Sequence, residues 1–196
     1  KGVGSERAWV LLGTESLQTL GGSGFLQDYP LQQYVRDAKI DTLYEGTTAI
    51  QANDLIGRKT AKEGGKSMQQ LLADIAETGS ALRNTGDAGL KDLADALGDG
   101  IAALDEATHW LLANYDSNPQ AAAAGSVPFL KLTGIVAGGW QMARAALIAQ
   151  AKIDGGDADP CYAAKVVTTR FYADHILTQA DGLAESIVAG ASGTMA

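Results

Sequence analysis

Apolar residues recur every three or four positions along most of the chain, which is the spacing that places side chains on one face of an α-helix. The most regular stretch covers residues 90 to 111 and includes Leu90, Leu93, Leu97, Ile101, Leu104 and Leu111. The same spacing from Met68 to Leu82 predicts another helix before it. Both segments carry polar residues between the apolar ones, so we expect each helix to bury one side only.

A third helix is predicted from Ser126 to Ile153, and its apolar residues lie on nearly every side, so we expect it to be central and buried. A fourth begins at Asp159-Pro160, an N-cap acid followed by proline, and should run to about Val188. Residues 190–196 should fray. Short loops join the four helices, and the sequence contains no pair of alternating strands. This favours an all-α fold with an antiparallel four-helix bundle over residues 61–196.

The pattern of apolar residues, glycines and prolines in the first 60 residues predicts a separate segment of shorter helices. The expected elements are a helix at residues 3–20 ended by glycines at residues 21–24, a short helix from Pro30 through Val35, a connector at residues 38–44 and a helix at residues 47–58. Three lysines and two glycines in residues 59–66 indicate a linker. We therefore expect one domain at residues 1–60 and a second at residues 61–196.

Composition and charge exclude several classes of function. The 196 residues carry a formal net charge of −8, which argues against general nucleic-acid binding because neutralising phosphates requires Lys and Arg. The single cysteine, Cys161, excludes an intramolecular disulfide and fits a reduced compartment. No stretch has the about 18 consecutive apolar residues of a membrane-spanning helix. The chain begins KGVGSERAW, without Met and within a helical pattern, so we expect a fragment of a longer protein.

The segment LYEGTTAIQ, from Leu43 to Gln51, places one acid before a glycine and two threonines. Glu45 could be an ordinary helix-start acid, with Thr47 or Thr48 capping the helix that follows. It could instead be the base of an enzyme, for which an apolar pocket, walled in part by Tyr44 and Ile50, would have to make the carboxylate more basic. Taken alone, the segment favours the structural interpretation.

A second candidate is the glycine-rich stretch QTLGGSGF, from Gln18 to Phe25. Glycines let a backbone approach a ligand closely, although glycine-rich helix ends usually only end helices. His109 and His175 have no partner at a metal-ligand spacing, so no metal site is expected. Trp9 and the other two tryptophans lie at helical core spacing and are expected to pack.

Four motifs occur in order within about 35 residues: QTLGGSGF, DYP, RDAKI and YEGTTAIQ. Together they resemble the C-terminal helical domain of the acyl-CoA dehydrogenases, over roughly residues 1–60. By helix pattern and position, residues 61–196 resemble the extra C-terminal helical domain of a bacterial, acetyl-CoA dehydrogenase-like branch of that family. The resemblance implies a cytoplasmic bacterial flavoenzyme that converts an acyl-CoA to the trans-2-enoyl-CoA with FAD.

The resemblance also assigns roles to individual residues. Glu45 matches the catalytic base that removes the α-proton, and Gly46 and Tyr44 match substrate-binding positions. Thr47, Thr48 and Ala49 match the contact to the FAD diphosphate, although the family often has a polar residue where Ala49 stands. Gln18, Gly21 and Gly22 match a stretch that reaches the FAD of a neighbouring subunit, which implies a homo-oligomer, either a dimer or a tetramer. Arg36 and Asp37 are expected to be structural.

The family's first helical domain and middle β-domain are not matched by any residues of this chain. The resemblance therefore implies half a site, inactive without the N-terminal part of the same enzyme. An electron-transferring flavoprotein is the implied electron acceptor. An acyl-CoA oxidase remains the alternative, and peroxide production would distinguish it. A non-catalytic oligomerisation or docking role for residues 61–196 also remains open.

Overall fold

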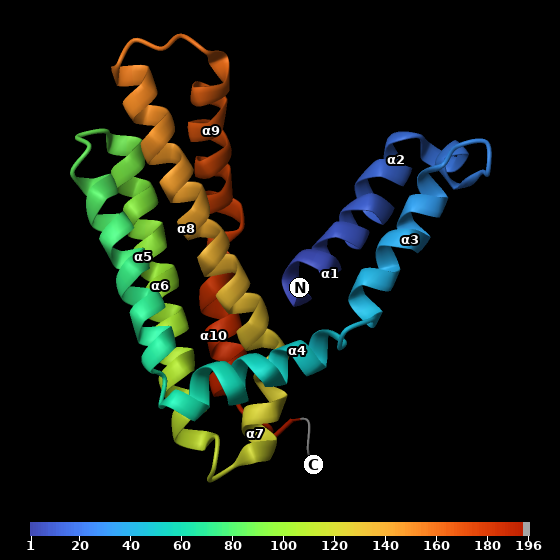
Figure 1. Cartoon of the computed structure of the whole chain (residues 1–196), viewed down its shortest axis with the longest axis vertical. Helices are drawn as coiled ribbons and strands as arrows, with labels where there is room; N and C mark the ends of the chain where they lie inside the picture. The colour runs from blue at the N-terminus through green and yellow to red at the C-terminus, as the bar shows by residue number, and fades with distance from the viewer. Residues whose placement is uncertain (194–196) are drawn as a thin grey trace. The chain divides into compact units, whose positions relative to one another are not determined.

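The computed structural model describes residues 1–193, which form two compact units, Lys1–Leu55 and a second unit that begins at Ile56 (Figure 1). Helices and turns make up both units, and no strand occurs among the described residues, so the all-α prediction is confirmed. None of the described helices has the length and apolar character needed to cross a lipid bilayer.

Unit 1, Lys1–Leu55, is built on two long helical runs that pack against each other. Its elements are α1 (Gly2–Leu11), a π-helical turn (Leu12–Ser16), α2 (Leu17–Thr19), a 3₁₀ turn (Gly21–Phe25), α3 (Leu31–Leu43) and α4 (Thr48–Asp54). Few of its residues are buried: Gly2, Gly24, Thr42 and Ala52. Packing within this unit therefore encloses almost no apolar core.

The predicted connector at residues 38–44 is wrong, because α3 continues through it to Leu43. No glycine or proline interrupts residues 31–44, and the Thr42 hydroxyl donates to the Lys39 carbonyl oxygen (3.0 Å). Thr42 is also buried. The helix ends only at Tyr44, two residues before the first glycine, Gly46.

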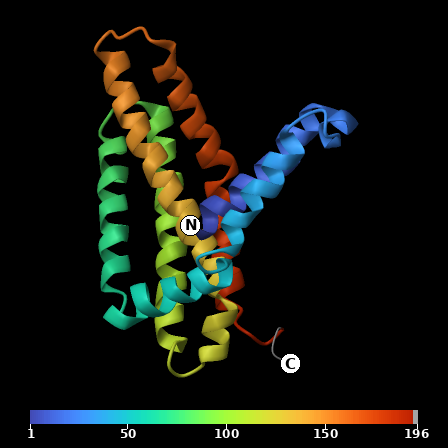
Figure 2. The same cartoon turned by 45° about the vertical axis from the view of Figure 1, so that its right-hand side comes forward.

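Unit 2 contains four long, successively antiparallel helical segments (Figures 1 and 2). Its elements are a π-helical turn (Leu55–Thr60) that begins at the boundary, a 3₁₀ turn (Ala61–Glu63), α5 (Lys66–Arg83), α6 (Ala88–Asn114), α7 (Pro119–Ala124), α8 (Ser126–Asp154), α9 (Pro160–His175), a 3₁₀ turn (Leu177–Gln179) and α10 (Ala180–Val188). The bundle prediction is confirmed, with α7 as an addition that the sequence did not indicate.

The core of unit 2 comes from one face of each helix. Its fully buried side chains include Ile75, Leu82, Leu90, Leu97, Leu104, Leu111, Phe129, Leu132, Val136 and Ile187. As predicted, α8 is central, since it contacts α5, α6, α9 and α10. It is not buried all round, because Val127 and Ile148 are exposed. Trp110 and Trp140 are half-buried, and Trp140 Nε1 donates to Thr78 Oγ1 (2.8 Å).

The single helix predicted from residue 160 to about 188 is wrong, because α9 ends at His175 and a 3₁₀ turn separates it from α10. Leu177 in that turn is buried. A Cβ on Gly139 would lie 2.5 Å from Leu177 Cδ1, and one on Gly100 would lie 3.5 Å from Leu177 Cγ. Close packing of Leu177 against these two glycines explains the break, and no glycine or proline marks it in the sequence. Residues 190–193 form turns, and the rest of the segment expected to fray lies outside the described residues.

We predict that Ile75→Ala lowers the free energy of unfolding by about 2–5 kcal/mol, because it removes buried methyl groups and leaves a cavity. Ile75 is 0% exposed. The matched control is Ile148→Ala, at a residue that is 65% exposed, and it should change stability by less than about 0.5 kcal/mol. Urea denaturation followed by circular dichroism measures both. Equal losses for the two variants would contradict the assigned core.

Candidate functional site

The turn that carries Glu45 joins α3 to α4 and has an unusual backbone. Glu45 has φ of 54°, and it is the one non-glycine residue with positive φ in the described part of the chain. Left-handed backbone is unfavourable for a residue with a Cβ, and it persists where surrounding contacts enforce it. The preceding Tyr44 is extended, so the chain reverses sharply at Glu45.

Two contacts from α4 hold this turn. The Gln51 side-chain amide donates to the Glu45 carbonyl oxygen (2.8 Å). Gly46 also has a positive φ, 86°, and a Cβ there would lie 3.0 Å from Ile50 Cγ2. Position 46 therefore requires glycine both for its backbone conformation and for space.

The side chains at the turn point outward. Glu45 is exposed, Tyr44 is 52% exposed and Ile50 is 59% exposed. Within residues 1–193 the Glu45 carboxylate makes no hydrogen bond or ion pair, and α4 has no side-chain cap. The Glu45 side chain therefore does not cap α4.

The two threonines after Gly46 have different positions. Thr47 is the N-cap residue of α4 but its exposed side chain makes no capping hydrogen bond, so the predicted threonine cap is wrong. The Thr48 hydroxyl donates to Glu6 Oε1 (2.7 Å). Ala49 is exposed and offers only its backbone. The first turn of α4 consequently presents N–H groups that no side chain caps, which is an arrangement that favours an anion.

Glu6 on α1 is a site residue that the sequence did not indicate. Its second oxygen accepts a hydrogen bond from Trp9 Nε1 (2.9 Å), and Lys39 Nζ lies 4.2 Å from the Trp9 ring centroid. The bonds from Trp9 and Thr48 hold the pKa of Glu6 below its ordinary value of 4.5. Glu6 is 42 positions from Thr48 in the sequence, so no local motif could have revealed the contact.

The glycine-rich stretch lies at the opposite end of unit 1. Gln18, Gly21 and Gly22 are all exposed, and Gly21 has φ of 57°. A Cβ on Gly24 would lie 2.6 Å from the Leu17 carbonyl oxygen, so this buried glycine has a structural role. A close approach that only glycine allows is thus found at Gly24 and not at Gly22, where a Cβ would meet nothing.

The structure does not bring these glycines to the Glu45 turn. The start of α1 contacts α3 and α4, where Lys1 Nζ donates to the Asp41 carbonyl oxygen (2.6 Å). The helical run from Gly2 to Thr19 then spans roughly 25 Å away from that end, as both views of α1, α2 and α3 show (Figures 1 and 2).

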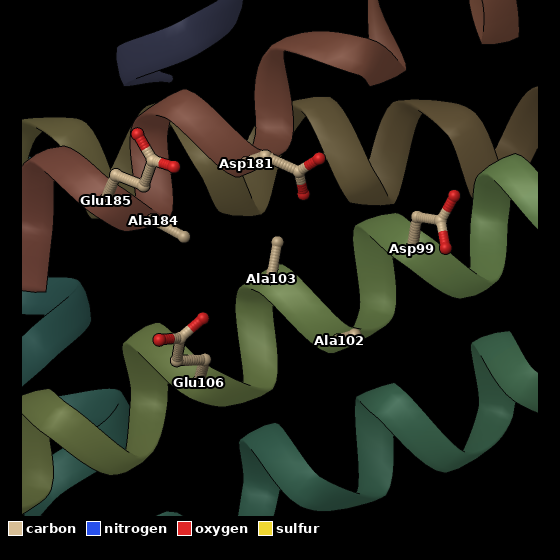
Figure 3. A pocket seen from close by; sticks show the side chains of 7 residues that line it. All are labelled: Asp99, Ala102, Ala103, Glu106, Asp181, Ala184 and Glu185. Carbon is tan, nitrogen blue, oxygen red and sulfur yellow. The ribbon is translucent and has the colours of Figure 1, made fainter.

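A separate hollow of about 360 Å³ lies between α6 and α10 in unit 2 (Figure 3). Asp99, Glu106, Asp181 and Glu185 line it, together with three alanines. Four carboxylates repel an anionic ligand, so this hollow does not suit a phosphate or a coenzyme A. No group of three or more His, Cys, Asp or Glu residues in the described part of the chain is arranged to hold a metal ion.

Comparison with known families matches both parts of the chain. The model of the "Acyl-CoA dehydrogenase, C-terminal domain" matches residues 3–60, which include the Glu45 turn. The model described as "Acetyl-CoA dehydrogenase C-terminal like" matches residues 66–196, which is more than half of the chain.

Curated relatives match across the two parts together. The chain is 42% identical to the 3-methylmercaptopropionyl-CoA dehydrogenase of Ruegeria pomeroyi, over 91% of this chain and 30% of that protein. It is 44% identical to a broad-specificity linear acyl-CoA dehydrogenase of Mycobacterium tuberculosis, over 90% of this chain and 30% of the relative. A butyryl-CoA dehydrogenase of Syntrophomonas wolfei is 32% identical over 88% of this chain and 28% of its own length.

The chain thus spans about 30% of the length of these relatives. The Glu45 turn lies in the segment that matches the family's C-terminal domain, and the helical bundle lies in the segment that matches the acetyl-CoA dehydrogenase-like extension. This chain belongs to the acyl-CoA dehydrogenase family, as the C-terminal part of a member of the bacterial branch that carries the additional helical domain.

Proposed function

We propose that this chain is part of an FAD-dependent enzyme that converts an acyl-CoA to the trans-2-enoyl-CoA in fatty-acid β-oxidation, with Glu45 as the α-proton base. The observation that carries the proposal is the Glu45 turn. Its backbone is held in the left-handed region while its carboxylate has no partner among residues 1–193. A carboxylate with a fixed backbone and no structural partner is available to accept a proton from a substrate.

Each residue of the turn has a proposed part in the reaction. The Glu45 carboxylate accepts the α-proton, and its backbone N–H donates to the thioester carbonyl oxygen, where negative charge develops. Gly46 lets the substrate approach the backbone, and the exposed Tyr44 ring lines the acyl chain. The FAD that the start of α4 would help to hold would supply the acceptor for the β-hydrogen, which leaves as hydride. The α-proton goes to Glu45 and the double bond forms between the two carbons.

Two separate parts of unit 1, the start of α4 and the glycine-rich stretch, have features that suit contact with FAD. Thr47, Thr48 and Ala49 begin α4, and the uncapped N–H groups there suit a diphosphate. The Thr48 hydroxyl is already bound to Glu6, so Thr47 has the hydroxyl that is open to the cofactor. Gln18, Gly21 and Gly22 lie at the far end of unit 1, which is a placement that supports contact with the FAD of a neighbouring subunit in a homo-oligomer.

Unit 1 also exposes a large share of its apolar side chains. They include Val10, Leu11, Leu20, Phe25, Leu26, Tyr29, Tyr34, Ile40 and Leu43. Exposed apolar surface of this extent indicates contact with further protein. We propose that the N-terminal part of the same enzyme covers it and supplies the apolar surroundings of Glu45.

The proposal divides the chain into residues 1–60, the end of the catalytic helical domain, and residues 61–196, an extension with a packing role. An electron-transferring flavoprotein is the proposed acceptor of the two electrons that bound FAD would take from the substrate. The proposed location is the bacterial cytoplasm.

We predict that Glu45→Gln in the complete enzyme lowers kcat by at least about 10²–10⁴-fold, because an amide cannot accept the α-proton. Flavin content should stay unchanged, since the amide keeps the shape of the carboxylate. Steady-state kinetics with a linear acyl-CoA and the visible flavin spectrum measure the two effects. Glu15→Gln, at an exposed acid of the same unit, is the control and should leave kcat unchanged. Full turnover by Glu45→Gln would refute the role of Glu45.

We predict that residues 1–196 expressed alone purify without flavin, because α4 and the glycine-rich stretch supply only part of the cofactor's contacts. The flavin spectrum of the purified chain, compared with that of the complete enzyme, measures this. A yellow preparation that keeps FAD through gel filtration would show that this chain alone forms the cofactor site.

The extension should also contribute to assembly. Val167 and Phe171 lie one helical turn apart on α9, with 69% and 58% of their surfaces exposed. We predict that replacing both with Ser in the complete enzyme lowers the oligomeric state measured by light scattering, because an apolar contact is lost. Thr168→Ala, on the same helix and also exposed, is the control. An unchanged oligomer in the double variant would contradict an assembly role for this face.

A further inference from the structure

A polar cluster at one end of unit 1 links three helices around the Glu45 turn. The Glu6 carboxylate on α1 accepts from Trp9 Nε1 (2.9 Å) with one oxygen and from Thr48 Oγ1 (2.7 Å) with the other. Lys39 on α3 lies over the Trp9 ring, with its ammonium 4.2 Å from the ring centroid. Each of these contacts lies within Lys1–Leu55.

The cluster connects the two helices that flank the turn, α3 and α4, to α1. Lys39 is six positions before Glu45, in the last part of α3, and Thr48 is three positions after it, in the first residue of α4. Glu6 bonds to Thr48 directly and to Trp9, on which Lys39 rests. Glu6 and Trp9, both on α1, therefore tie α4 and α3 to the same helix on either side of the reversal.

The left-handed backbone of Glu45 requires contacts that hold the helices on both sides of it. Its backbone conformation is unfavourable and is kept only while the flanking elements hold it. The local contacts, Gln51 to the Glu45 carbonyl oxygen and Gly46 against Ile50, come from α4 itself. They do not link α4 to α3, whereas Glu6 holds Thr48 on α4 and the nearby Trp9 ring holds Lys39 on α3.

We propose that Glu6 is a positioning residue for Glu45, because its hydrogen bond from α1 to Thr48, braced within α1 by the bond from Trp9, sets the direction of the base. This inference rests on the proposed function. It assigns Glu6 no contact with substrate or flavin. The bonds from Trp9 and Thr48 lower the pKa of Glu6, and both bonds are charge-assisted because a glutamate is ionised at neutral pH.

The test uses the complete enzyme with butyryl-CoA, octanoyl-CoA or palmitoyl-CoA, whichever the wild type oxidises fastest, with and without deuterium at the α-carbon. Glu6→Ala should lower kcat per bound flavin about 10- to 100-fold, since a displacement of about 1 Å at the reacting group has an effect of this order. KM and flavin content should change little. The α-deuterium isotope effect on kcat should rise, because proton abstraction alone has slowed.

Two variants separate positioning from simple loss of structure. In Glu6→Gln the amide oxygen can accept from Trp9 while the amide nitrogen donates to the Thr48 hydroxyl, so kcat should return to within about threefold of the wild type. Trp9→Phe removes one donor and keeps the ring, and it should give a smaller loss of kcat with a raised isotope effect. It also tests the bridge if Glu6→Ala does not fold. Glu15→Ala is the matched control and should behave as the wild type.

Wild-type kcat in Glu6→Ala would overturn the inference, as would equal losses in the Ala and Gln variants with an unchanged isotope effect. Neither result would contradict the proposed function, which is tested separately by the loss of turnover in Glu45→Gln. Conversely, an active Glu45→Gln variant would remove the proposed function, and with it the base that Glu6 is inferred to position.

Discussion

Unit 1 has almost no apolar core, and this constraint explains why its shape depends on polar contacts. Its buried residues are two glycines, a threonine and an alanine, so hydrophobic burial within the unit cannot fix the angle between its helices. Specific polar contacts act at the end that carries Glu45. Glu6 bonds to Trp9 and Thr48, and Lys1 bonds to the Asp41 carbonyl oxygen. A hydrogen bond has a preferred direction, so a few of them can define a turn that apolar packing leaves loose.

Unit 2 has the opposite balance. Buried Leu, Ile and Phe side chains line α5, α6 and α8, while α9 buries Thr169 and Ala173. Ion pairs of this unit such as Arg83 with Asp95 lie on exposed surface, where they add little. This unit can be stable by its own packing, whereas unit 1 exposes side chains such as Phe25 and Ile40. The contrast agrees with the separate matches of two family models, one to residues 3–60 and the other to residues 66–196.

Much of the fold followed from the sequence because helical periodicity reports burial. It predicted α5, α6 and α8 with boundaries close to those observed. Helical periodicity gave wrong helix boundaries where tertiary contacts determine them. Leu177 breaks the last helix by packing against Gly100 and Gly139, and α3 continues through residues that resembled a connector. The Glu45 motif could be found from sequence, but Glu6 could not, because its partner on α4 is 42 positions away.

The conformation of the Glu45 turn bears on the choice between a structural and a catalytic glutamate. A helix-start acid gains stability from the dipole of the following helix, and no side chain, that of Glu45 included, makes a capping bond to α4. The unfavourable backbone at Glu45 would then have no compensation in a capping bond. A catalytic base needs a fixed backbone with a side chain that stays free until substrate arrives. Gln51 contacts the Glu45 backbone, Glu6 contacts the Thr48 side chain, and the Glu45 carboxylate stays unengaged within residues 1–193, which is a combination that suits the proposed second role.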